Sequence, residues 1–349
     1  MTSGTGGQAT GGSGGGGTGG GGAGSGGGGA GGGGGITGPS IIDGCSDSAP
    51  VPAGTGCGLA PEQELGTFVD YEITTCGTKA ADATGNPGPW TYDREFFLWL
   101  PPDYDPTHAY SLVLQGPGCG GNGESVYPLT LNGNSGADGQ VIRVGLTPPP
   151  NSINRQFDLP GCFDNFEGDD SVEWPFYEAV MDWLNTKVCI DPSLVFASGT
   201  STGAALANEL GCRYAGHPEY PIRGVLPNAG ALPAEPEHRP VCSTAPMAGM
   251  WIHEVNDATW PFAGTTDAIT RAMQVNGCTP GTDYATASFT DYPIGDGNPD
   301  NVCQKISGCP ETHPLVVCPL PGNGRGTHDN IANPGFSTFI LDLAQPLEP

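Results

Sequence analysis

The segment Leu194-Val195-Phe196-Ala197-Ser198-Gly199-Thr200-Ser201-Thr202-Gly203-Ala204-Ala205 decides the fold. Its first five residues are typical of a short buried strand, and residues 201–212, which are small residues and Leu, predict a helix. Between them lies a G-x-S-x-G pattern centred on Ser201, which marks a nucleophile elbow when it joins a strand to a helix. The same pattern occurs in a glycine tract at 11–15, so the strand-then-helix setting is what selects Ser201. The alternative is a serine that caps an ordinary helix.

Strands and helices alternate along most of the remaining chain. Phe176, Val180, Leu184 and Val188 fall on one helical face, so we expect a helix over 173–187. Such alternation predicts the α/β class, with a mostly parallel central sheet and helices on both faces. Together with the elbow it indicates an α/β-hydrolase fold. The other expected elements are strands at 94–100, 110–115, 194–198, 224–228, 248–253 and 314–318, and helices at 265–276 and 335–343.

Composition divides the chain into three parts. Residues 1–40 are mostly Gly with scattered Ser, Thr and Ala, and such a composition behaves as a disordered linker or tether. Residues 41–60 form a short Pro/Gly/Cys segment, where one interpretation is a small loop closed by Cys45 and Cys57. Residues 61–349 are expected to form the catalytic domain, with 279–312 as a disulfide-held excursion.

Charge and cysteine content indicate the compartment and the classes of partner. The net charge is −26 with 11 Lys plus Arg, which excludes a nucleic acid as partner. Twelve cysteines without a C-x2-C pair, and six scattered His, favour disulfides in an oxidising compartment over a zinc site; buried free thiols are the alternative. No run of eighteen apolar residues predicts a transmembrane segment. No signal peptide is visible after Met1, and we expect a secreted or surface-tethered protein.

A nucleophilic serine needs a base, and in this fold the chain order is Ser, then Asp or Glu, then His. His328 lies in a loop between the strand 314–318 and the last helix, where the fold delivers its histidine. His313 precedes that strand, and His253 comes before the expected acid. His328 is therefore the predicted base.

The acid is expected at the carboxyl end of a strand, because the ligand-binding and catalytic residues of open α/β sheets lie there. Asp257 follows the strand 248–253 directly, while Glu254 and Asp267 are rivals. Asp257 is the predicted orienting group, which fixes the tautomer of His328.

Two backbone amides should stabilise the tetrahedral oxyanion. One is the amide of Thr202, and the other is predicted to be that of Cys119 in a glycine-rich turn. An ordinary glycine-rich turn is the alternative for the second. Trp174 and Trp260 are candidate substrate-binding residues, with plain core or rim packing as the alternative.

These segments together resemble the secreted polyhydroxybutyrate depolymerase and feruloyl/acetylxylan esterase group of α/β-hydrolases, over about residues 90–345. The matching motifs are Pro117-Gly118-Cys119-Gly120-Gly121, 190–203, Ile252-His253-Glu254-Val255-Asn256-Asp257 and Gly324-Arg325-Gly326-Thr327-His328. Family members have His in place of Pro117 and a Trp-Pro pair after the last histidine, which this chain lacks. The resemblance implies that Asp257 is the acid.

The sequence thus predicts a secreted serine esterase that hydrolyses feruloyl or acetyl esters of plant cell-wall polysaccharide through a Ser-His-Asp acyl-enzyme. We expect no cofactor and no metal ion, and a partner that is an ester substrate, polymeric in the plant-polysaccharide or polyester case. One alternative is an extracellular polyhydroxyalkanoate depolymerase. The other is a non-catalytic surface binding protein on a hydrolase scaffold.

Overall fold

The computed structural model describes residues 42–45, 49–77, 90–126, 141–149, 153–154, 159–164, 168–233, 238–294, 302–321, 328 and 335–344. All of them belong to the compact unit Pro39–Pro349. The glycine tract predicted to be a linker lies outside the described residues. No helix in the described part of the chain is long and apolar enough to cross a bilayer.

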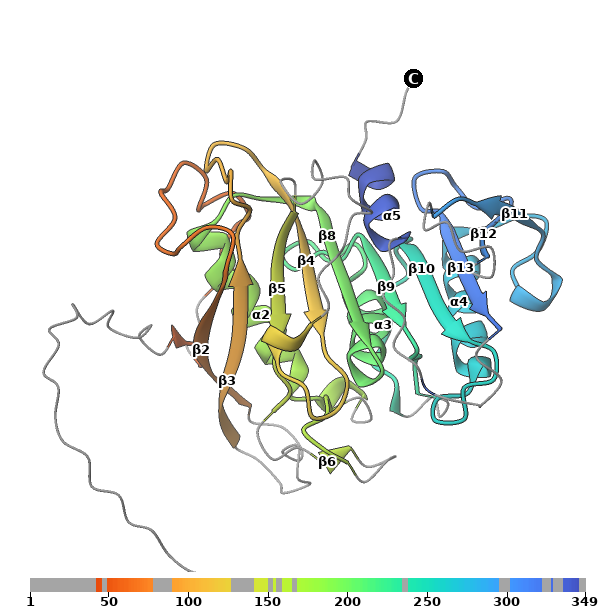
Figure 1. Cartoon of the computed structure of the whole chain (residues 1–349), viewed down its shortest axis with the longest axis horizontal. Helices are drawn as coiled ribbons and strands as arrows, with labels where there is room; N and C mark the ends of the chain where they lie inside the picture. Colours follow the sequence, from red (N-terminus) through yellow and green to blue (C-terminus); the bar gives the residue numbers. More distant parts are fainter. Residues whose placement is uncertain are drawn as a thin grey trace, which may run out of the picture. The chain divides into compact units, whose positions relative to one another are not determined.

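An eleven-stranded sheet runs through the unit in the order β1-β2-β3-β5-β4-β8-β9-β10-β13-β12-β11 (Figure 1). From β5 to β13 the neighbouring strands are parallel, while β3 and β12 run antiparallel to their neighbours. The predicted, mostly parallel sheet is therefore confirmed. The strands are β1 (Ile42–Asp43), β2 (Phe68–Gly77), β3 (Trp90–Trp99), β4 (Tyr110–Gly116), β5 (Val141–Leu146), β8 (Ile190–Thr200), β9 (Gly224–Asn228), β10 (Ala248–Glu254), β11 (Phe289–Tyr292), β12 (Cys303–Ile306) and β13 (Leu315–Leu320). A separate two-stranded sheet pairs β6 (Ile153–Asn154) with β7 (Leu159–Pro160).

Two hydrophobic cores lie on the two faces of the sheet, because side chains alternate along each strand. One face, with Leu112 and Val225, packs against α2 (Glu173–Lys187), α3 (Thr202–Tyr214) and α4 (Phe262–Asn276). The other face, with Val113 and Leu226, packs against α5 (Gly335–Ala344). Short 3-10 helices are η1 (Gly123–Ser125), η2 (Gly168–Asp170) and η4 (Tyr284–Thr286).

All twelve cysteines are paired, so the free-thiol alternative is wrong. The segment 41–60 is not a self-closed loop, because each of its cysteines reaches into the main domain: Cys45 to Cys76 in β2 and Cys57 to Cys189. The excursion 279–312 is held by disulfides as predicted, and it also adds β11 and β12 to one edge of the sheet. The remaining pairs are Cys119–Cys162, Cys212–Cys242, Cys278–Cys309 and Cys303–Cys318.

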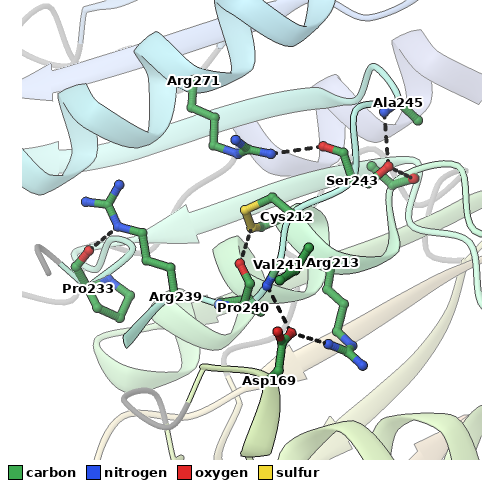
Figure 2. The surroundings of a disulfide bond; sticks show 12 residues. Asp169, Cys212, Arg213, Pro233, Arg239, Pro240, Val241, Ser243, Ala245 and Arg271 are labelled. Atoms are coloured by element: carbon green, nitrogen blue, oxygen red, sulfur yellow. Dashed lines mark hydrogen bonds and ion pairs between the residues drawn. A yellow bond between two sulfur atoms is a disulfide. The ribbon is translucent and has the colours of Figure 1, made fainter. Parts of the chain in front are cut away.

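The Cys212–Cys242 disulfide fastens the segment 238–245 to the end of α3 (Figure 2). Asp169 supports the same junction, because its Oδ1 accepts hydrogen bonds from Arg213 at 2.7 Å and from the Val241 amide at 2.9 Å. These contacts hold the carboxyl-terminal end of α3, the helix whose first residue follows Ser201.

Candidate active site

Ser201 occupies the turn between β8 and α3, as the sequence predicts. Its φ of 57° and ψ of −120° lie in a region that L residues rarely adopt. The turn is held by a hydrogen bond from the Ser201 amide to the Asn228 carbonyl at the end of β9, 3.0 Å long. A strained, non-glycine backbone that its surroundings fix in place is typical of functional sites.

The two glycines of the motif are required by close backbone approach. A Cβ at Gly203 would overlap the carbonyl oxygen of Gly116, and one at Gly199 would overlap the backbone of Gly203. Any side chain at these positions would therefore push α3 away from β4 and β8. Residues 204–207 are also small or buried, so the start of α3 lies directly against the sheet.

The loop after β4 faces the serine. A Cβ placed on Gly118 would lie 3.4 Å from Ser201 Cβ, and the Thr202 hydroxyl lies 3.6 Å from Cys119 Sγ. The loop is tied to a second segment by the Cys119–Cys162 disulfide and by the hydrogen bond from the Gly120 amide to the Gly161 carbonyl, 2.8 Å long. The two amides predicted to form the oxyanion hole therefore belong to neighbouring backbone segments.

Asp257 lies in the loop 255–261 between β10 and α4, which we term the acid loop. Its side chain is buried, and Oδ1 accepts hydrogen bonds from the amides of Thr259 and Trp260, both at 2.8 Å. Oδ2 lies 2.6 Å from His328 Nδ1 and 3.1 Å from His253 Nε2. Each carboxylate oxygen thus has two donors.

The same contacts set the charge state of Asp257. Burial raises the pKa of the carboxyl group, but the hydrogen bonds from His253, His328 and the Trp260 amide outweigh it and hold the pKa well below its ordinary range. Asp257 is therefore ionised at neutral pH, as a group that orients an imidazole must be.

His328 is bonded through only one of its two ring nitrogens. Nδ1 binds Asp257, whereas Nε2 is shielded from solvent and has no hydrogen-bond partner among the described residues. With Nδ1–H donated to a carboxylate, Nε2 is the basic nitrogen of the neutral ring. Of the loop 322–330, which carries the family-like glycine motif, only His328 lies within the described residues.

Two of the rival residues, Asp267 and His313, lie away from the Asp257–His328 pair. Asp267 is mostly exposed on α4 and its carboxylate lies 3.9 Å from Arg239. His313 precedes β13, and burial, with a smaller effect from Arg223, lowers its pKa to about 4. Neither residue has a contact with Asp257 or His328 among the interactions of the described chain, so the structure brings together the pair that the chain order predicts.

One residue of this cluster was not predicted as part of the site. His253, near the end of β10, lies with its Nε2 3.1 Å from Asp257 Oδ2 and is only 1% exposed. His253 precedes the acid in the chain, so chain order excludes it as the catalytic base. Its position four residues before Asp257, near the end of a strand, is the sequence signal that could have placed it beside the acid.

The two candidate tryptophans are both buried, at 3% exposure. The Trp174 indole donates to the Gly168 carbonyl at 2.9 Å and packs edge-on to Tyr214. Trp260 packs against Ala205 and Ala231. Both side chains are therefore as buried as the alternative interpretation, plain core packing, predicts.

The sheet order and the strand–serine–helix elbow define an α/β-hydrolase fold. No family model matches the chain. The chain is 30% identical over 195 residues to "Probable feruloyl esterase C" of Aspergillus niger, covering 54% of this chain and 63% of that protein. It is 26% identical over 238 residues to "Feruloyl esterase C" of Emericella nidulans, covering 67% and 77%.

The match spans less than two thirds of the Aspergillus niger protein and, at 62%, of the corresponding Aspergillus clavatus protein. The chain thus has the fold of an α/β-hydrolase and is similar, over part of its length, to fungal proteins named feruloyl esterase C.

Proposed function

We propose that this protein is a serine esterase that hydrolyses carboxylic esters through Ser201, His328 and Asp257. The observation that carries the proposal is the 2.6 Å hydrogen bond between His328 Nδ1 and Asp257 Oδ2. It leaves His328 Nε2 buried and without a hydrogen-bond partner among the described residues. The same structure holds Ser201 in a strained elbow.

In this mechanism Ser201 Oγ attacks the ester carbonyl while its proton passes to His328 Nε2. Asp257 holds the imidazole and stabilises its charged form. The amides of Thr202 and Cys119 donate to the oxyanion, and the partial positive charge at the start of α3 adds to their effect. The protonated His328 then gives its proton to the leaving alcohol.

The acyl-enzyme is resolved by the reverse sequence. Water loses a proton to His328 Nε2 as its oxygen attacks the acyl carbonyl, and the second oxyanion collapses to release the acid and restore the Ser201 hydroxyl. His328 Nε2 carries out all the proton transfers and Ser201 carries the acyl group, so none of these steps uses a cofactor.

The substrate class we propose is feruloyl or acetyl esters of plant cell-wall polysaccharide. The sequence relatives named feruloyl esterase C support it. The six disulfides support export to an oxidising compartment, where such polymers lie.

A panel of esters tests the proposal. Oxidised, folded protein should hydrolyse p-nitrophenyl acetate and either methyl ferulate or acetylxylan, and Ser201→Ala should abolish each activity. Hydrolysis of a polyhydroxybutyrate film alone would contradict the polysaccharide assignment and favour a polyester depolymerase. No hydrolysis of any ester would contradict the esterase and favour a binding protein.

A further inference from the structure

His253 is a buried histidine for which the proposed mechanism has no step. Its Nδ1 lies 2.6 Å from the Thr265 hydroxyl on α4. Its Nε2 lies 2.8 Å from the Trp260 carbonyl oxygen and 3.1 Å from Asp257 Oδ2. The ring thus joins β10, the acid loop and α4 through three polar contacts, and at 1% exposure neither solvent nor substrate touches it.

These partners determine where the ring carries its proton. The Trp260 carbonyl oxygen only accepts hydrogen bonds, so Nε2 must carry a hydrogen and donate it. The same hydrogen faces Asp257 Oδ2. The Thr265 hydroxyl then donates to Nδ1 of the neutral ring, and all three contacts are satisfied by one tautomer.

The donor set around Asp257 shows what this ring adds. The amides of Thr259 and Trp260 hold Oδ1 but leave the carboxylate free to turn about that atom. The contact from His253 fixes the position of Oδ2, the oxygen that accepts from His328.

We propose that His253 is a positioning residue, which holds the Asp257 carboxylate so that Oδ2 directs a lone pair at His328 Nδ1. The inference rests on the proposed function. In this role His253 acts only through Asp257, and it neither touches the substrate nor transfers a proton.

The role also has an electrostatic consequence. The titratable groups in described contact with the carboxylate are His253 from β10 and His328 from the loop after β13, while α4 contributes the uncharged Thr265. Without the His253 donor Oδ2 can turn away from His328 Nδ1, so the carboxylate stabilises the His328 imidazolium less. The acid limb of the kcat/KM profile should therefore move to lower pH, a shift that a loss of stability alone does not cause.

The test compares two replacements of His253 with a matched control. His253→Phe keeps a ring but removes all three contacts, whereas His253→Gln places an N–H near the position of Nε2. Trp251→Phe is the control, because it removes another buried hydrogen bond on β10, to Asn208 at 2.8 Å, without any contact to Asp257.

With p-nitrophenyl acetate, His253→Phe should lower kcat about tenfold to a hundredfold at unchanged KM, the cost of a misplaced catalytic group. The acid limb should move to lower pH, and His253→Gln should restore most of the rate. Trp251→Phe should keep the wild-type profile. Wild-type kcat and pH profile in His253→Phe would overturn the proposal, as would an equal loss in Trp251→Phe.

If His253→Phe does not fold, Thr265→Val and Thr265→Ser replace it. Valine removes the hydroxyl that holds Nδ1 and leaves the ring in place, whereas serine keeps the hydroxyl. A lower kcat in the valine variant alone supports the proposal, and equal rates in both overturn it. A wild-type protein that hydrolyses no ester would instead contradict the proposed function, so the two failures are distinguishable.

Discussion

Replacing Asp257 by asparagine changes one atom at the centre of the site. In the structure Oδ1 accepts two backbone amides, while Oδ2 faces two imidazole N–H groups. The asparagine oxygen would take the place of Oδ1, because only an acceptor satisfies the amides of Thr259 and Trp260. The NH2 group would then face the donors of His253 and His328.

This donor-to-donor arrangement drives His328 to the other tautomer. Nδ1 then accepts from the new NH2 group and Nε2 carries the proton, so the ring no longer takes the proton of Ser201. A wrong tautomer of this kind lowers kcat about 10⁴-fold, which corresponds to about 5.4 kcal/mol in the activation free energy.

The assay is hydrolysis of p-nitrophenyl acetate at pH 7 by wild type, Asp257→Asn and Asp267→Asn, each with its fold checked by thermal unfolding. Asp267 is a suitable control because it is a carboxylate on the adjacent helix with only a distant ion pair to Arg239. Retention of more than a tenth of kcat in Asp257→Asn, or a large loss in Asp267→Asn, would refute the reasoning.

The same variant should change how stability depends on pH. The pKa of Asp257 is lowered in the folded protein, so its ionised form stabilises the fold above the ordinary Asp pKa of about 3.9, and this contribution is lost as pH falls toward the folded pKa. The difference in unfolding free energy between wild type and Asp257→Asn should therefore shrink by about 1 kcal/mol between pH 5 and pH 3. Urea unfolding at both pH values measures it, and a constant difference would contradict the assignment of the lowered pKa.

Two further predictions concern strain and the oxyanion loop. Ser201→Gly should be more stable than Ser201→Ala by about 1 kcal/mol in denaturant unfolding, because glycine adopts a φ of 57° without strain; an alanine variant of equal stability would mean that the elbow stores no strain. Replacing both Cys119 and Cys162 by serine should cost about 3–4 kcal/mol of stability and lower kcat at least about tenfold. The matched Cys278/Cys309 variant, whose cysteines are 31 rather than 43 residues apart, should lose similar stability at unchanged kcat in the same ester assay, and equal kcat losses would argue against a role for the Cys119 amide.

Local patterns predicted the elements whose burial is one-sided and periodic. The helix over 173–187 has the bounds of α2 because its apolar residues recur on one face. The helix predicted over 265–276 ends at Asn276 as expected, because the next residue, Gly277, adopts the left-handed conformation with φ of 67°. In both cases neighbours along the chain supply the determining interaction.

Elements that depend on distant partners were missed. β2 (Phe68–Gly77) is only partly buried along its length, so no continuous apolar run marks it. β12 was assigned to an irregular excursion, because what makes it a strand is its antiparallel pairing with β13 and the Cys303–Cys318 disulfide. Neither interaction is visible from local propensity.

The candidate site also has one contact that the sequence predicted and one that it did not. Chain order was sufficient to predict that Asp257 and His328 would meet, since the fold delivers both to the same edge of the sheet. The pairing of His253 with Asp257 depends on how the acid loop turns back over the end of β10. This contact depends on the tertiary structure of the acid loop, which local sequence patterns do not predict.

The central claim is that Ser201 is an activated nucleophile. The most direct measurement is mass spectrometry of oxidised, folded protein after treatment with a fluorophosphonate probe, with the modified residue located by peptide mapping. We expect one adduct, on Ser201, which is absent in Ser201→Ala and forms much more slowly in Asp257→Asn. No adduct on the folded wild-type protein, or an adduct on another residue that persists in Ser201→Ala, would contradict the claim.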